Sequence, residues 1–97
     1  MMHAQLTDGA LLLRFGRQFG VQEAERLSEA ILSFAPLSHL TLDFAGVRDF
    51  QDSACGLLAT TLVANRGLKV ALRGLTIQQS RRLRHFGVEE PASAFAT

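Results

Sequence analysis

The sequence predicts a small α/β domain in which a mixed sheet of four to five strands packs against about three helices. Short segments with alternating apolar residues are separated by longer segments whose apolar residues recur at helical spacing. An Asp-Gly pair joins the first two strand segments, which predicts an antiparallel hairpin. After the hairpin, helices and strands alternate with short connections, so the remaining strands are expected to be parallel with right-handed crossovers.

The first half of the chain is expected to form the hairpin and one helix. Strand segments at residues 2–7 and 10–15 flank Asp8-Gly9, where Gly tolerates the positive φ of a tight turn. A helix is expected at residues 21–35, and Pro36 ends the run. The apolar residues at helical spacing in that segment are Ala24, Leu27, Ile31 and Phe34.

The second half is expected to contain two strands, each followed by a helix. Residues 40–44 and 68–72 alternate as strands do. A helix beginning at Asp52-Ser53 is expected to end at Gly67, which would adopt the left-handed backbone conformation common after helix C-termini. A last helix is expected from Thr76, its N-cap residue, to Phe86, with Gly87 directly after it. The stripe of the first of these helices comprises Ala54, Leu57, Leu58, Thr61, Leu62 and Asn65.

Composition favours one folded domain over residues 1–97, with residues 89–97 as a loose tail. A formal net charge of +1 does not favour nucleic-acid binding. The single cysteine and the absence of metal-type Cys and His spacing predict a reducing, cytoplasmic location and no metal or other cofactor. No apolar run is long enough to insert into a membrane directly.

Ser53 is the residue whose position most needs explanation. It stands at the predicted start of a helix, where backbone N–H groups are unpaired and a capping oxygen or a phosphate is favoured. The simplest interpretation is that Ser53 caps the helix, a use of Ser worth about 1 kcal/mol. Asp52 would then add a favourable negative charge near that N-terminus, and Asp43 would be a polar residue at a strand end, exposed or hydrogen-bonded to the next loop.

Residues 40–62 resemble the characteristic segment of the STAS domain family, named for sulfate transporters and anti-sigma factor antagonists. In that family a hydrophobic strand ending in Asp leads to an Asp-Ser turn and a helix, and the order of the other predicted elements also agrees over nearly the whole chain. The residues that carry the resemblance are Leu40-Thr41-Leu42-Asp43-Phe44, Val47, Phe50, Asp52-Ser53-Ala54, Leu57 and Leu58.

The resemblance implies a bacterial signalling protein that regulates transcription through protein–protein contacts. In the anti-sigma factor antagonists of the family, the serine after Asp in this turn is phosphorylated, and here that residue is Ser53. The partner would be an anti-sigma factor with serine kinase activity. The partner-binding residues implied are Asp43, Asp49, Asp52, Ser53, Ala54 and Cys55.

Other interpretations remain open at this point. Family members often have Gly where this chain has Cys55, and a side chain there could alter how closely a partner approaches. The chain could instead be a regulatory subunit that holds the ATPase of an ABC transporter without phosphorylation. Two copies could also form a homodimer through strand edges or through the helix after Ser53. No catalytic motif is present, so we expect no enzyme activity and no catalytic residues.

Overall fold

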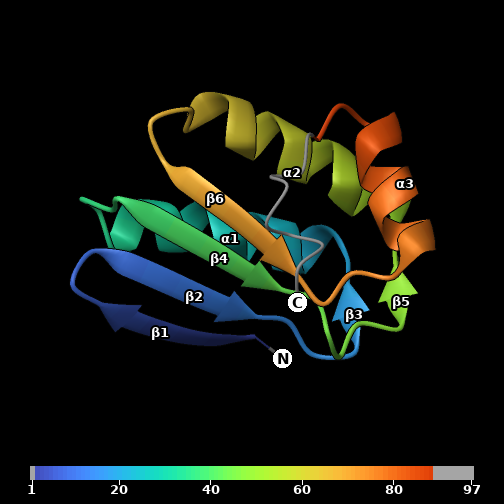
Figure 1. Ribbon diagram of the computed structural model, residues 1–97, viewed down its shortest axis with the longest axis horizontal. Helices are drawn as coiled ribbons and strands as arrows, with labels where there is room; N and C mark the ends of the chain where they lie inside the picture. Colours follow the sequence, from blue (N-terminus) through green and yellow to red (C-terminus); the bar gives the residue numbers. More distant parts are fainter. Residues whose placement is uncertain (1, 89–97) are drawn as a thin grey trace.

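The computed structural model describes residues 2–88, and its elements alternate along the chain much as the sequence predicts. Figure 1 shows the sheet with helices packed against it. The elements are β1 (His3–Thr7), β2 (Ala10–Arg14), β3 (Gln18–Phe19), α1 (Val21–Ser33), β4 (His39–Asp43), β5 (Asp49–Phe50), α2 (Asp52–Ala64), β6 (Lys69–Arg73) and α3 (Ile77–His85).

The main sheet has four strands in the order β1-β2-β4-β6. β1 and β2 are antiparallel, whereas β2, β4 and β6 are parallel, so the predicted hairpin and parallel crossovers are confirmed. Asp8 and Gly9 have φ values of 48° and 77°, the positive values that a two-residue type I′ turn requires. This turn fixes the register in which Thr7 pairs with Ala10.

The core lies between one face of the sheet and the helices. The buried leucines of β2, β4 and β6 share that face because their positions are in register across the three strands. The helices contribute Ala24, Leu27 and Ile31 from α1, Ala54, Cys55 and Leu58 from α2, and Leu83 from α3. The apolar spacing in the sequence therefore identified most of the residues that hold the layers together.

A second, two-stranded sheet was not predicted from the sequence. β3 and β5 pair in parallel and bring Phe19 and Phe50 beside Phe15 and Phe44, with neighbouring ring centroids 4.8 to 5.8 Å apart. The Gln51 N–H donates to the Phe19 carbonyl at 3.1 Å, directly before α2. This aromatic cluster therefore fixes the point at which α2 begins.

Several helix-end predictions need correction. The helix predicted at residues 21–35 ends at Ser33, and Phe34 is partly exposed as its C-cap. Gly67 does not have the left-handed φ that was expected, because α2 ends through Asn65, whose Nδ2 donates to the Thr61 carbonyl at 2.8 Å. Thr76 caps α3 as predicted, and Gly87 has a φ of 89°. The predicted tail, residues 89–97, lies outside the described residues.

We expect Gly74→Ala to lower the free energy of unfolding by about 3 kcal/mol. Gly74 has a φ of 76°, and a Cβ there would lie 2.5 Å from the Ala45 backbone nitrogen. The matched control is Gly67→Ala, since a Cβ at Gly67 meets nothing within 4 Å and should change stability by less than about 1 kcal/mol. Urea unfolding measures both, and equal losses would contradict this account of Gly74.

Candidate functional site

The site predicted from the sequence lies where β4 ends and α2 begins. The chain passes from Asp43 through β5, which contains Asp49, to the first turn of α2 with Asp52 and Ser53. Ser53, Asp49 and Asp52 are exposed, whereas Asp43 is only 6% exposed. Of these four residues, the structure therefore places three on the surface and one beneath it.

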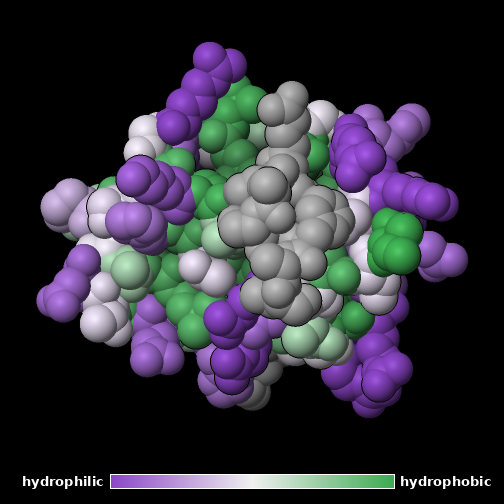
Figure 2. All heavy atoms as spheres, viewed as in Figure 1, coloured by the Kyte–Doolittle hydropathy of each residue, from purple (hydrophilic) through white to green (hydrophobic). Residues whose placement is uncertain are grey.

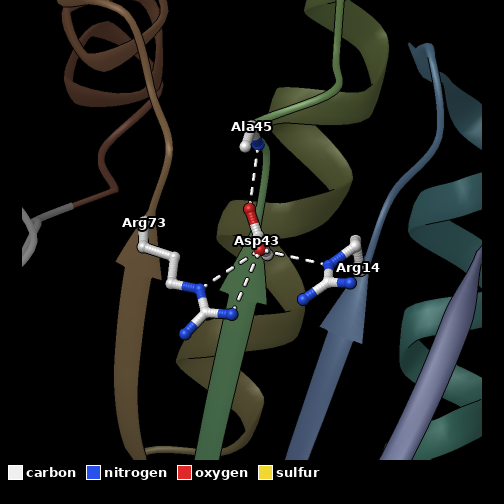
Figure 3. A network of polar contacts seen from close by, with 4 residues as sticks. All are labelled: Arg14, Asp43, Ala45 and Arg73. Carbon is white, nitrogen blue, oxygen red and sulfur yellow. Dashed lines mark hydrogen bonds and ion pairs between the residues drawn. The ribbon is translucent and has the colours of Figure 1, made fainter. Parts of the chain in front are cut away.

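Asp43 is a buried structural acid and not the exposed strand end considered from the sequence. One carboxylate oxygen accepts from Arg14 Nε at 3.3 Å and from Arg73 at 3.2 Å, and the other accepts from the Ala45 N–H at 2.9 Å (Figure 3). The expected hydrogen bond to the following loop is thus confirmed. Burial alone would raise the pKa of Asp43, but the hydrogen bonds from Ala45, Arg73 and Arg14 outweigh it and lower that pKa.

Ser53 does not cap α2, so the simplest interpretation made from the sequence is wrong. Gln51 is the N-cap residue and makes no side-chain capping hydrogen bond, and Ser53 is the second residue of the helix. Within the described part of the chain, no hydrogen bond to the Ser53 hydroxyl is present. The hydroxyl is therefore exposed and available, and the fold does not use it.

Asp52 is tied to α3 by a salt bridge. Arg82 Nη2 lies 2.6 Å from an Asp52 carboxylate oxygen, Arg82 Nη1 donates to the Phe50 carbonyl at 2.7 Å, and the guanidinium lies 5.9 Å from the centre of the Phe50 ring. The partners are about half exposed, so the ion pair itself contributes little to stability. Its effect is to position the first turn of α2 against α3.

Ala54 and Cys55, both predicted to contact a partner, have fully buried side chains. Cys55 therefore does not present a side chain to an approaching partner, in contrast to the expectation from the sequence. Burial raises the pKa of the Cys55 thiol to about 11, which keeps it protonated at neutral pH. Within residues 2–88, no group of His, Cys, Asp and Glu could hold a metal ion, and no helix is long and apolar enough to cross a membrane.

An uncharged exposed face on α2 was not predicted from the sequence. From Ser53 to Ala64 the helix contains no charged residue, and its solvent side carries Ser53, Gly56, Leu57, Thr60, Val63 and Ala64, which we call the α2 face. Leu57 was predicted on the buried stripe but is 38% exposed, and Val63 is 58% exposed. The signal that could have identified this face is a helix with no charged residue on any side after Asp52.

A groove of about 470 Å³ lies beside the second half of α2. Its lining comes from α2, from β6 with the residues before it, and from Gly87 and Val88. Figure 2 shows apolar side chains on part of this side of the molecule, with hydrophilic side chains around the rim. The groove lining is mixed, because Asn65 and Arg66 lie among its apolar side chains.

Comparison with known proteins identifies the fold. No family model and no curated protein matches the sequence. The solved structure of the anti-sigma factor antagonist SpoIIAA in its unphosphorylated form matches with a TM-score of 0.69 and 13% identity, covering 90% of this chain and 81% of that one. RsbS of Moorella thermoacetica, carrying a serine-to-glutamate substitution, matches with a TM-score of 0.68 and 15% identity, covering 91% and 79%.

Longer proteins also contain a similar unit. The murine Slc26a9 anion transporter, in the inward-facing state, matches with a TM-score of 0.62 and 19% identity, covering 87% of this chain but only 15% of the transporter chain. A structure of Mglu matches with a TM-score of 0.63 and 16% identity, covering 72% of this chain and 18% of that one. The chain therefore has a STAS-like fold, as the sequence predicted.

We expect Asp43→Asn to lower the free energy of unfolding by about 1 to 3 kcal/mol at pH 7. Because the folded protein lowers the pKa of Asp43, its contribution is complete above the ordinary value of 3.8 and is lost as the pH falls through the folded-state pKa. The difference between wild type and Asp43→Asn should therefore shrink below pH 3.8.

The matched control for this prediction is Asp49→Asn, because Asp49 is exposed and lies outside the Asp43 network. Urea unfolding from pH 7 down to the acid range measures all three proteins. A difference between wild type and Asp43→Asn that stays constant across that range would contradict the assignment.

Proposed function

We propose that this chain is a non-catalytic regulatory module that binds a protein partner through the α2 face and is released when a partner serine kinase phosphorylates Ser53. The observation that carries the proposal is the uncharged α2 face with Ser53 at its N-terminal end. The STAS-like fold, which resembles those of the anti-sigma factor antagonist SpoIIAA and of RsbS, supports a regulatory role and favours an anti-sigma factor as the partner.

The chemistry of the α2 face fits a protein partner. The solvent side of a surface helix normally carries charged residues. The solvent side of α2 carries none between Ser53 and Ala64. Leu57 and Val63 offer apolar side chains that a partner could bury, and Gly56 allows close approach of a backbone. A surface of this kind lowers the free energy of a complex through the removal of apolar area from water.

Phosphate on Ser53 would weaken such a complex without unfolding the chain. It would add about −1.5 to −2 charges at pH 7 next to Asp52, whose carboxylate already forms an ion pair with Arg82. The backbone N–H groups at the N-terminus of α2 could donate hydrogen bonds to the phosphate, because Gln51 provides no capping side chain. A partner surface matched to a neutral hydroxyl would lose about 3 kcal/mol of binding free energy, roughly a hundredfold in affinity.

The surroundings of Ser53 support a substrate of a kinase and not a catalyst. A catalytic serine needs a base within hydrogen-bond reach. Two of the histidines have other neighbours, since His39 Nδ1 lies 2.9 Å from the Ser38 hydroxyl and the His85 ring contacts Phe86 edge-on. Chemistry at Ser53 is therefore assigned to the partner, which brings ATP, and no cofactor is assigned to this chain.

We expect Ser53→Glu to lower the amount of partner captured from the source cells roughly a hundredfold, and Ser53→Ala to leave it unchanged. The added negative charge opposes a partner surface matched to the neutral hydroxyl. Tagged proteins are captured and their partners quantified by mass spectrometry, with the Ser53 peptide of the wild type read for phosphate. Ser33→Glu is the control, since it adds the same charge at the end of α1, near the opposite end of α2.

The same experiment separates the two kinds of partner. A kinase captured with phosphate on Ser53 supports the anti-sigma factor pathway. An ABC transporter ATPase captured equally by both Ser53 variants, with Ser53 unmodified, would replace it with the transporter-subunit alternative. Equal capture of a kinase by Ser53→Glu and Ser53→Ala would contradict the switch.

Leu57→Lys should also reduce capture of the partner, by about tenfold or more, because it places a charge within the apolar part of the α2 face. Leu32→Lys is the matched control: Leu32 is 77% exposed on α1, outside the α2 face, and should change capture little. Circular dichroism checks that both variants fold. Equal capture by the two variants would show that the partner does not use the α2 face.

A further inference from the structure

β1 is an edge strand without the features that usually protect an edge. All five residues, His3–Thr7, are exposed, and only β2 pairs with the strand within the described part of the chain. Natural edges are commonly blunted by Lys, Pro or a β-bulge. β1 contains no Lys or Pro, and its pairing with β2 proceeds residue by residue without a bulge. The opposite edge strand, β6, carries Lys69 and Arg73.

The hairpin determines which backbone groups of β1 face outward. Thr7 and Ala10 flank a two-residue turn, so they form a hydrogen-bonded pair, and such pairs alternate along an antiparallel ladder. The N–H and C=O groups of Thr7, Gln5 and His3 therefore point toward β2. Those of Ala4 and Leu6 point toward the free edge, where they are available to a further strand.

We propose that two copies of this chain associate edge to edge, β1 against β1 in antiparallel orientation, about a twofold axis that passes beside Gln5. In this register Ala4 of each copy lies opposite Leu6 of the other, and Gln5 lies opposite Gln5. Two four-stranded sheets then become one continuous sheet of eight strands. The inference does not depend on the proposed function, because it uses neither Ser53 nor the α2 face.

The strand that pairs with the free edge of β1 is β1 of a second copy, because β1 is complementary to itself. The twofold register places the two residues with outward backbone groups opposite each other, so Ala4 and Leu6 exchange two hydrogen bonds on each side of the axis. On the helix side of the sheet, Leu6, 47% exposed in one copy, covers Ala4 of the other. No Asp, Glu, Lys or Arg is present in β1, so the symmetric pairing brings no like charges together.

The proposed dimer leaves the α2 face accessible. β1 forms one edge of the sheet, whereas α2 leads into β6 at the other edge, and Figure 1 shows the two elements at opposite sides of the molecule. A dimer would therefore present two α2 faces. A pair of five-residue strands buries less than about 1,200 Å², the lower end of the range for standard interfaces. We therefore expect a weak dimer with a dissociation constant between about 10 µM and 1 mM.

Cysteine cross-linking tests both the pairing and its register. Gln5→Cys places two thiols opposite each other in a non-hydrogen-bonded pair, where Cα atoms about 4.5 Å apart suit a disulfide. Thr7→Cys is the matched control: it has the same exposure and the same sheet face, but its copies lie about 14 Å apart across the axis. The native Cys55 does not interfere, since it is buried and protonated.

Under mild oxidation, Gln5→Cys should form a disulfide dimer about tenfold faster than Thr7→Cys. Sedimentation of the wild-type chain should show a mass that rises toward the dimer between about 1 µM and 1 mM. Cross-linking of Thr7→Cys at a rate equal to or above that of Gln5→Cys would overturn the register. A wild-type chain that remains monomeric at about 1 mM would overturn the dimer itself.

Discussion

The buried carboxylate of Asp43 holds together the ends of the three parallel strands. It binds arginines from β2 and β6 while its own strand lies between them (Figure 3). Backbone hydrogen bonds reinforce the same point: the Phe15 N–H donates to the Asp43 carbonyl, and the Phe44 N–H donates to the Arg73 carbonyl. Because the third partner of Asp43 is the Ala45 N–H, the loop that leaves β4 has a fixed direction.

Two further contacts carry that fixed direction to the start of α2. The phenylalanine rings of β3 and β5 pack with those at the ends of β2 and β4, and Arg82 joins α3 to the turn before α2. The exposed turn near Ser53 is therefore supported by packed phenylalanine rings and by the hydrogen bond from Arg82. This rigid support suits recognition by surface charge and shape, since binding requires no rearrangement of the fold.

The sequence was a good guide wherever the deciding interactions are local. The hairpin turn, the Thr76 cap and the apolar spacing of α1 depend on residues a few positions apart, and all are present. The role of Asp43 depends on arginines 29 and 30 residues away, which no local pattern reveals. Likewise, β3 and β5 are too short to show an alternating pattern, so their pairing was missed.

The candidate site was predicted in position but not in detail. The order of strand, acidic turn and helix brings Asp49, Asp52 and Ser53 close to the start of α2, and the structure exposes all three. It did not show that the next two side chains, Ala54 and Cys55, turn inward, because the rotation of a helix about its axis is set by packing. The same rotation exposes Leu57, which the spacing alone had assigned to the core.

The free hydroxyl of Ser53 has a consequence for how this chain evolves. Since the fold neither buries the side chain nor uses it as a helix cap, substitution at this position costs the folded state little. A lineage could therefore lose or regain the hydroxyl by a single substitution without unfolding the protein. Only selection on what the surface meets in the cell would preserve a serine here over long times, so its persistence among descendants would itself be a record of use.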